Sequence, residues 1–342
     1  MQGHSNTEAI EINLSKRKNA KFSKLFSPHT PTQEEVILWA HSSDDNGVWR
    51  NGGRRGARFA PEAITNCFAQ MNAEHLKLNQ PIMTYDIENK NSQTKYSQNF
   101  DFAQKESINS FKKLIDLTPK AKSLIHLGGG HDHVYPLLSA INSLYPHHPI
   151  GVINIDAHLD TRTDEVKHSG TPFRQFANQM ANSYKNTSIQ ASPFHLIQVG
   201  IHDYANALSN FKKMDYVTMQ VVPQNKSQCP QEMSALCLKY IKQSNVYFDK
   251  HFSDHCPIWI LSIDADGLDS SIMEAVSAVN HHGLTRSQIN QIVDIYKKEC
   301  LPETKIDIPQ ILGIYEYNPI YDNLSQKGAR SLSSIIYQFL FE

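Results

Sequence analysis

Short apolar runs alternate with longer segments of helical periodicity along most of this chain. After residue 101 the apolar runs have the length of buried strands, and the segments between them repeat apolar positions at helical spacing. Strands that alternate with helices indicate a mostly parallel sheet covered by helices on both faces. The predicted strands are Ser123–Leu127, Ile150–Ile155, His195–Ile201, Tyr216–Val222, Pro257–Ile263 and Ile311–Tyr315. The predicted helices are Phe102–Ile115, Tyr135–Tyr145, Pro172–Tyr184, a short one near Asn206–Lys213, Gln231–Gln243, one capped by Thr285, and Lys327–Phe341.

The N-terminal part of the chain is less regular. Residues 1–30 begin with a polar stretch rich in Lys, Ser and Asn, and we predict a flexible leader there. Glu34–Ala40 is predicted to form a short helix, and Pro61–Met71 a helix with proline near its start. The polar segment Asn89–Asn99 is predicted to be an exposed loop. No linker or change of composition divides the regular part, so residues 31–342 are predicted to form a single domain.

Composition excludes several classes of protein. The 342 residues carry a formal charge of −1, so no basic field favours nucleic acid or an anionic membrane as a partner. No apolar run approaches the roughly 20 residues that a membrane span needs. A content of 40% hydrophobic and 20% charged residues is normal for a soluble globular protein. The five cysteines are scattered, without a Cys-x-x-Cys pair, which indicates free thiols in a reducing cytoplasm.

One polar pattern stands at the end of a predicted strand. Ile153–Arg162 begins inside an apolar run and then places Asp156, His158 and Asp160 at alternate positions. In an extended backbone these side chains leave the same face, so two carboxylates and one imidazole converge there. By itself the pattern could equally be polar residues that open a loop.

Two further strand ends carry the same kinds of residue. Leu261–Asp269 ends an apolar run with Asp264 and Asp266, again two positions apart, and Leu127–Asp132 ends another run with His131. Parallel sheets bind their ligands at the carboxyl ends of the strands, so we expect these residues to meet. The predicted ligand set is His131, Asp156, His158, Asp160, Asp264 and Asp266.

Four aspartates and two neutral histidines would bring a charge of −4 to one place. Such a charge cannot be buried without cations, and two divalent ions balance it. Carboxylate and imidazole ligands without thiolate suit Mn²⁺ or Zn²⁺, and the excess of oxygen favours Mn²⁺. Two ions roughly 3.5–4 Å apart lower the pKa of a shared water and supply hydroxide near neutral pH. The alternative is that no metal binds and that the carboxylates line a solvent-filled opening.

These segments resemble the metal-binding motifs of the ureohydrolases, the superfamily of arginase and agmatinase. The resemblance rests on Gly-Gly-Gly-His131, Asp156-Ala-His158-Leu-Asp160 and Ser262-Ile-Asp264-Ala-Asp266, and it covers roughly residues 47–342. It implies an arginase-like three-layer α/β/α sandwich with a mostly parallel sheet. It also implies two Mn²⁺ ions per subunit, one held by His131, Asp156, Asp160 and Asp264, the other by His158, Asp156, Asp264 and Asp266.

A further motif implies how the substrate is held. Glu316, in Tyr315–Pro319, is similar to the glutamate of the family's Glu-x-Asn-Pro segment, which binds the cationic guanidinium or amidine of the substrate. Without the resemblance, this residue would be interpreted as a surface acid at a strand end. In the mechanism that the resemblance implies, a metal-bridging hydroxide attacks the amidine carbon. Asp160 is then expected to carry a proton to the leaving nitrogen.

Two segments resemble those of the formimidoylglutamases: Gly47–Pro61 is similar to their N-terminal signature, and Ser169–Phe173 to their Ser-Gly-Thr-Pro-Phe. This implies hydrolysis of N-formimidoyl-L-glutamate to L-glutamate and formamide, a step in histidine degradation. The two carboxylates of that substrate need forked cationic donors, which arginine supplies. The predicted substrate-binding residues are Arg50, Asn51, Arg54, Ser169, Arg174 and Glu316.

The position of the proton shuttle is ambiguous in the sequence. Arginases and agmatinases carry a catalytic histidine where the alignment places Ser169, and a serine cannot hold a proton there. His168 is adjacent, so an alignment shifted by one residue would restore an imidazole. His168 therefore joins Asp160 and Glu316 as a predicted catalytic residue.

Alternatives remain at the level of activity. Within the same class the chain could be an agmatinase or another guanidino-acid hydrolase, and from another class a catalytically silent relative retained for binding. Intact ligand positions and Glu316 count against silence. Tyr315, Ala60 and Glu274 depart from the pattern of the relatives, which affects the identity of the substrate more than the metal site. The expected partner is a small-molecule amidine, and formation of a homo-oligomer is left open.

Overall fold

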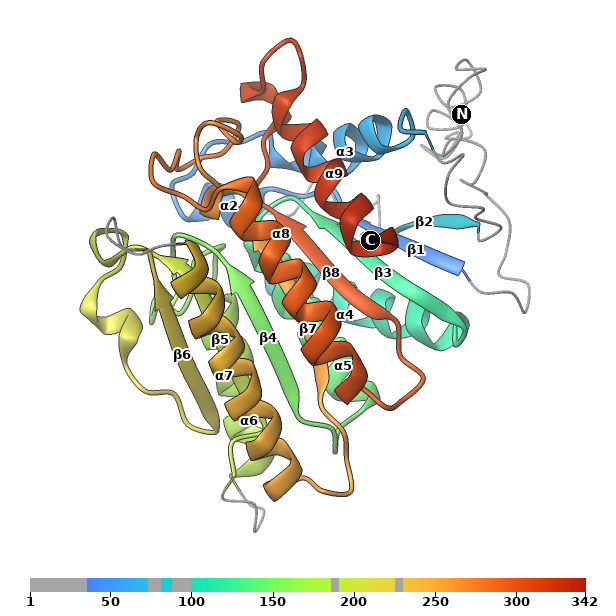
Figure 1. The fold of residues 1–342 in the computed structure, drawn as a ribbon, viewed down its shortest axis with the longest axis vertical. Helices are drawn as coiled ribbons and strands as arrows, with labels where there is room; N and C mark the ends of the chain where they lie inside the picture. Colours follow the sequence, from blue (N-terminus) through green and yellow to red (C-terminus); the bar gives the residue numbers. More distant parts are fainter. Residues whose placement is uncertain (1–35, 73–80, 88–99, 186–190, 225–229) are drawn as a thin grey trace.

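Eight parallel strands form the centre of the described molecule (Figure 1). The computed structural model describes residues 36–72, 81–87, 100–185, 191–224 and 230–342. All neighbouring strands in this part of the chain are parallel, as their alternation with helices predicted. In sheet order the strands are β2 (Ile82–Asp86), β1 (Val36–Ser42), β3 (Ala121–Gly128), β8 (Gln310–Tyr315), β7 (Ile258–Asp264), β4 (Ile150–Ile155), β5 (Phe194–Ile201) and β6 (Val217–Pro223).

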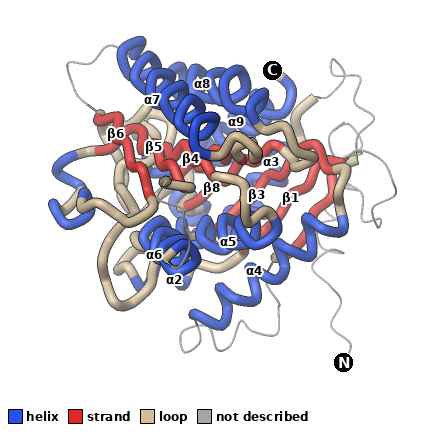
Figure 2. The backbone as a smooth tube through the Cα atoms, turned by 90° about the horizontal axis from the view of Figure 1, so that it is seen from below, coloured by secondary structure: helices blue, strands red, loops and turns tan. Residues whose placement is uncertain are grey.

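Helices cover both faces of the sheet, so the molecule has three layers (Figure 2). On one face lie α3 (Ala60–Phe68), α7 (Pro230–His251), α8 (Arg286–Ile295) and α9 (Lys327–Phe341). On the other face lie α4 (Phe100–Leu117), α5 (Val134–Leu144) and α6 (Pro172–Tyr184). The short helix α2 (Asn46–Arg50) packs against the segment that follows β3. The predicted three-layer α/β/α sandwich with a parallel sheet is confirmed.

The central strands are apolar on both sides because helices cover both faces. All six residues of β4 and all seven of β7 are buried. Successive side chains of β4 enter opposite cores: Ile153 and Ile155 belong to the cluster under α7, α8 and α9, and Ile150 and Val152 to the cluster under α4, α5 and α6. Burying each such side chain contributes roughly 1.5–3 kcal/mol, so the strand ends are held by a rigid framework.

The prediction of a helix over Glu34–Ala40 is wrong. Val36–Ser42 is strand β1, fully buried and paired with β2 on one side and β3 on the other. An apolar run this short does not distinguish a buried strand from a buried helical turn, and here tertiary pairing decides. Strand β2 was not predicted, because an edge strand with partly exposed side chains lacks a continuous apolar run.

Other predicted elements agree with the structure or differ in extent. Thr285 is the N-cap of α8 in a capping box with Gln288, as predicted. The helix predicted over Gln231–Gln243 continues to His251. The segment near Asn206–Lys213 forms short 3₁₀ turns in place of an α-helix.

The flexible leader predicted for residues 1–30 and the loop predicted for Asn89–Asn99 lie outside the described residues. Of the helices that the structure describes, none combines the length and the apolarity needed to cross a membrane.

The strand order brings distant segments of the chain to one edge. The strands β3, β8, β7 and β4 are consecutive in the sheet, and all of them run in the same direction. Their carboxyl ends therefore lie side by side, and so do the segments that follow them, as in other open parallel sheets that bind ligands at this edge.

Candidate metal centre and active-site cavity

Glycines lead the chain from β3 into the site. Gly128–Gly130 precede His131, which begins a short 3₁₀ turn and is fully buried. A Cβ atom at Gly129 would collide with the carbonyl oxygen of Asp44, so only glycine lets these two segments approach each other. The close approach places the His131 ring at the carboxyl ends of the neighbouring strands, where it contacts Ser262 of β7 and Tyr315 of β8.

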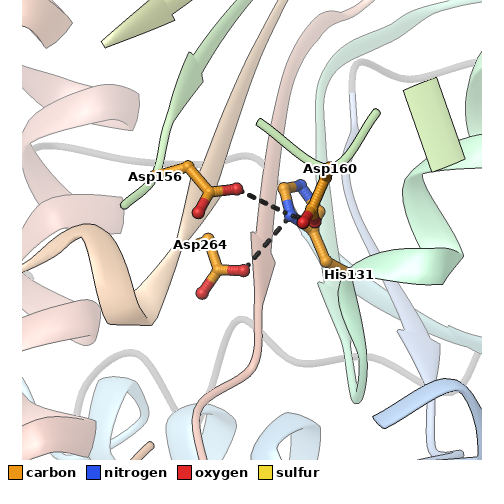
Figure 3. Close-up of side chains that lie close together, drawn as sticks. All are labelled: His131, Asp156, Asp160 and Asp264. Carbon is orange, nitrogen blue, oxygen red and sulfur yellow. Dashed lines mark ion pairs between the residues drawn. The ribbon is translucent and has the colours of Figure 1, made fainter. Parts of the chain in front are cut away.

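Three carboxylates surround one nitrogen of His131 (Figure 3). Its Nδ1 atom lies 2.8 Å from Oδ2 of Asp160, 3.2 Å from Oδ2 of Asp156 and 3.2 Å from Oδ2 of Asp264. Asp156 follows β4 and Asp264 is the last residue of β7. The first group of candidate ligands is therefore assembled from three different strand ends, as predicted.

A second group lies next to the first and shares Asp156 with it. The Nδ1 atom of His158 lies 3.1 Å from Oδ2 of Asp266 and 3.6 Å from Oδ1 of Asp156. The two oxygens of Asp156 thus face the two groups. Asp264 belongs to the first group, and its Oδ1 accepts the main-chain N–H of Asp266 at 2.9 Å. Its predicted sharing with a second ion stays a prediction.

Neighbouring side chains orient these groups. The Nε2 atom of His131 lies 3.0 Å from the Ser262 hydroxyl, so the ring presents Nδ1 to the carboxylates. The Asn154 side-chain amide donates to Oδ2 of Asp156 at 3.1 Å and is shared with Gln198 at 2.8 Å. Such outer partners fix the ring orientation and tautomer of a ligating histidine and the position of a ligating carboxylate.

Burial of so many carboxylates perturbs their proton affinity. Burial raises the pKa of Asp160 and Asp266, and raises the pKa of Asp264 well above its usual range. Burial would also lower the pKa of His131, but hydrogen bonds to the surrounding carboxylates raise it well above its usual range. In the absence of other cations, protons held by these groups offset the negative charge.

The residues fit a pair of divalent cations. They offer carboxylate oxygens and imidazole nitrogens without a thiolate, which suits Mn²⁺ or Zn²⁺. The Oδ1 atom of Asp266 is buried and has no hydrogen-bond partner in the described residues, which leaves it available to a cation. The six predicted ligands lie in the two adjoining groups: His131, Asp156, Asp160 and Asp264, and Asp156, His158 and Asp266.

Glu316 approaches the same groups from the end of β8. Its carboxylate accepts the main-chain N–H of His131 at 3.0 Å, and its own N–H donates to the carbonyl oxygen of Gly129 at 2.8 Å. Burial raises the pKa of Glu316 to about 8. Its φ of 62° and the φ of 51° at Asp160 lie in the left-handed region, which costs non-glycine residues free energy. The surrounding contacts hold both residues there.

A cavity of about 200 Å³ opens beside these carboxylates. It is lined by ligand residues and Glu316, together with Asn51, Arg162 and Ser169. The Nη1 atom of Arg162 donates to Oδ1 of Asn51 at 2.7 Å, and the Asn51 amide donates to the Ser169 hydroxyl at 3.2 Å. The cavity lining therefore combines acidic groups with a guanidinium held by Asn51.

Comparison with known proteins is consistent with this geometry. The profile of the Arginase family matches residues 36–342. The chain belongs to the Arginase family. A formimidoylglutamase of Staphylococcus aureus (strain MRSA252) is 29% identical over 329 residues, which cover 93% of this chain and 89% of the relative.

Solved structures of this family have the same fold. The formiminoglutamase of Trypanosoma cruzi, solved with Mn²⁺, superposes with a TM-score of 0.63 at 21% identity, over 94% of this chain and 97% of that one. The formimidoylglutamase of Bacillus subtilis superposes with a TM-score of 0.67 at 19% identity, over 91% and 88% of the two chains. The predicted arginase-like fold is confirmed, and this member of the Arginase family is a hydrolase of C–N bonds in amidines or guanidines.

The arginines predicted to bind substrate do not line the cavity of this Arginase-family protein. The Nε atom of Arg50 donates to the carbonyl oxygen of Lys167 at 2.8 Å. The guanidinium of Arg54 stacks over the Tyr321 ring, 3.9 Å from its centre. The Nε atom of Arg174 donates to a main-chain carbonyl at 3.1 Å. Their predicted contact with substrate stays a prediction without support from the cavity lining.

Arg162 lines the cavity, although no role was predicted for it from the sequence. The sequence contained a pattern that could have indicated this position. Asp156, His158 and Asp160 occupy alternate positions, and Arg162 is the next position in that series. The main chain there is no longer a strand, so alternation alone was insufficient. Its N–H donates to the carbonyl oxygen of Gly170 at 3.0 Å, which ties it to the Ser169 segment.

The adjacent residues His168 and Ser169 differ in orientation. Ser169 lines the cavity. Both ring nitrogens of His168 have partners, since Nε2 lies 2.8 Å from Oδ2 of Asp164 and Nδ1 accepts the N–H of Gly170 at 3.0 Å. Which of the two takes part in proton transfer stays a prediction.

Removal of metal should make the stability of the folded protein fall as the pH rises above about 6.5. The pKa of Glu316 is about 8 in the fold against 4.5 ordinarily, so the fold holds a proton that the unfolded chain has lost. Each pH unit in that window then costs about 1.4 kcal/mol. His131, whose pKa is also raised, acts in the same direction.

The measurement is the free energy of unfolding of chelator-treated protein between pH 6.5 and about 8, with Mn²⁺-loaded protein as the control. Histidines whose pKa burial lowers, such as His195 at about 4, act in the opposite direction until the pH is about one unit above the ordinary histidine value of 6.5. They act equally in the two forms, so the difference between the two slopes reports the metal groups. The loaded protein should show the smaller slope. A metal-free protein whose stability falls no more steeply with pH than that of the loaded protein would contradict the interpretation.

Proposed function

We propose that this protein is a binuclear manganese hydrolase that converts N-formimidoyl-L-glutamate and water to L-glutamate and formamide. The observation that carries the proposal is that acidic groups and a guanidinium line the same small cavity. Glu316 and Arg162 both belong to that lining. The substrate has matching groups, with a cationic amidine at one end and two carboxylates at the other.

Each end of the substrate has a partner of suitable chemistry. The buried Glu316 carboxylate offers a charge partner to the amidinium, and ionisation of an acid whose pKa is raised to about 8 is favoured when a cation lies against it. The Arg162 guanidinium, oriented by Asn51, can donate two parallel hydrogen bonds to a carboxylate. Agmatine has no carboxylate, so a guanidinium on the cavity wall would not assist its binding.

The two groups of acidic residues and histidines would hold the metal. His131, Asp156, Asp160 and Asp264 would bind one ion, and His158 and Asp266 with Asp156 the other. The excess of oxygen donors favours Mn²⁺. When bound, such a pair of ions lowers the pKa of a shared water and makes a nucleophile available near neutral pH.

The chain's own residues would then orient the substrate and move a proton. Glu316 holds the amidine carbon toward the metal groups, because its carboxylate is fixed by the N–H of His131. Asp160, which lies on the cavity wall, would pass a proton through its carboxylate to the nitrogen that leaves with glutamate. The names of the relatives from Staphylococcus aureus and Bacillus subtilis support this choice of substrate.

The enzyme is further proposed to work in a reducing cytoplasm. Cys237, Cys256 and Cys300 are free thiols, which supports this setting. Its place in histidine catabolism follows from the proposed substrate. Assembly into a homo-oligomer stays a prediction.

Asp156→Asn should lower both metal content and kcat strongly, because one shared side chain contributes to both groups. Metal analysis of the purified variant, together with its activity in Mn²⁺, measures this. The matched control is Asp249→Asn, an exposed aspartate on α7 that should bind two ions like the parent protein. Two ions and ordinary turnover in Asp156→Asn would contradict the role of Asp156 as the shared ligand, and one ion or none in fully loaded parent protein would contradict the binuclear assignment.

Formimidoylglutamate should be hydrolysed faster than arginine, agmatine or guanidinobutyrate when all are assayed side by side in Mn²⁺. Arg162→Ala should lower kcat/KM for formimidoylglutamate by roughly ten- to hundredfold, the value of a hydrogen bond to a charged group. Arg162→Lys should recover part of the loss, and Arg58→Ala, at an exposed arginine, should have no effect. Faster turnover of agmatine, or an Arg162→Ala variant with unchanged kinetics, would overturn the substrate assignment.

Ser169→Ala should retain activity within about tenfold, whereas loss of a general acid or base commonly costs roughly 10²–10⁴ in rate. His168→Ala is also expected to keep kcat in that smaller range, since its ring is engaged by Asp164 and Gly170 and its role would be to support the loop. Steady-state kinetics and metal content of both variants decide the matter. A collapse of kcat in His168→Ala alone, with normal metal content, identifies His168 as the proton shuttle.

A further inference from the structure

A second cavity, of about 460 Å³, lies at the opposite end of the sheet. It opens between the loops that precede β4 and β7, the strands whose other ends carry Asp156 and Asp264. In Figure 1 the arrowhead of β4 points away from this corner. The six residues of β4 put roughly 20 Å between this corner and the metal groups. The corner therefore takes no part in the hydrolytic site.

The two loops carry the same short pattern. His147-His148-Pro149-Ile150 precedes β4, and His255-Cys256-Pro257-Ile258 precedes β7. The strands pair in parallel with Ile150 opposite Ile258, and the N–H of Ile258 donates to the carbonyl oxygen of Pro149 at 2.9 Å. In this pattern His147 corresponds to His255 and His148 to Cys256. The turns that contain these residues lead into adjacent strands about 4.8 Å apart, so the two turns lie close to each other.

The side chains of these two turns are in contact. The rings of His147 and His255 stack with their centres 5.4 Å apart, and the ring of His148 meets that of His255 edge-on at 5.2 Å. The sulfur of Cys256 lies 3.8 Å from Nδ1 of His148. Three imidazoles and one thiol thus gather on one partly exposed corner.

Two hydrogen bonds orient donor atoms there. Nδ1 of His148 lies 2.8 Å from the carbonyl oxygen of Cys256, so that nitrogen carries the proton and Nε2 keeps its lone pair. A ring N–H donated to a carbonyl is the usual arrangement behind a metal-ligating histidine. The Cys256 sulfur accepts the N–H of Lys305 at 3.3 Å, which stabilises negative charge on the sulfur.

We propose that His147, His148, His255 and Cys256 form a second metal site, for a borderline divalent ion of the Zn²⁺ class. Imidazole and thiolate donors select such ions, and four of them match the tetrahedral preference of zinc. The catalytic groups, by contrast, are dominated by oxygen, so the two sites differ in metal preference. The rings must turn to close around an ion, which their partial exposure allows. The ion would clamp the amino ends of β4 and β7.

The test begins with full-length protein loaded with Mn²⁺, freed of excess metal and titrated with Co²⁺ as a spectroscopic substitute for Zn²⁺. One additional ion per chain should bind while the manganese content stays constant. A thiolate-to-cobalt charge-transfer absorption should appear, which the catalytic groups cannot produce because they contain no cysteine. Zn²⁺ should raise Tm by a few degrees, since it binds the folded state.

His147→Gln/His255→Gln should abolish the additional ion and the zinc-dependent rise in Tm, and Cys256→Ser should abolish the absorption band. The matched control His281→Gln, at an exposed histidine elsewhere, should bind like the parent protein. The manganese content of each variant reports that it is folded. Absence of an additional ion in the parent protein, or its retention in the double variant, would overturn the proposal. None of these measurements uses turnover, so failure of the proposed hydrolytic function would leave them unaffected.

Discussion

The negative charge of four aspartates at one edge of a buried sheet is the constraint on which the rest of this structure depends. Asp156, Asp160, Asp264 and Asp266 lie within a space from which water is largely excluded, where unpaired charge is costly. Two histidines, the amide of Asn154 and the hydroxyl of Ser262 are arranged around them. The apolar strands that precede these groups hold them in place, because the strand side chains are closely packed in the two cores and fix the positions of the strand ends.

That framework also sustains local strain where the chemistry is expected. Asp160 and Glu316 adopt left-handed backbone conformations, which glycine would adopt without cost. The bond from Glu316 N–H to the Gly129 carbonyl and the packing of Gly128–Gly130 keep the glutamate in position. A carboxylate held close to the candidate ligands then shares the lining of a small cavity with the guanidinium of Arg162.

The two ends of β4 and β7 carry different kinds of donor atom. β4 and β7 deliver oxygen-rich ligands at their carboxyl ends and imidazole and thiol groups at their amino ends. Hard and borderline cations differ in the donors they prefer, so one short stretch of sheet separates two coordination chemistries. In both places the parallel pairing of β4 and β7 brings segments far apart in the chain close together.

The sequence by itself determined the alternation of strands and helices and the spacing that puts Asp156, His158 and Asp160 on one face, because both follow from local periodicity. It did not distinguish β1 from a helix, since a buried run such as Val36–Ser42 is apolar in either form. Only the tertiary structure decided which arginine lines the cavity: Arg162 does, whereas Arg50, Arg54 and Arg174 contact main-chain carbonyls or an aromatic ring. It also decided that Ser169 lines the cavity and that His168 does not. These outcomes depend on how loops far apart in the chain meet at the sheet edge, and no local pattern specifies that meeting.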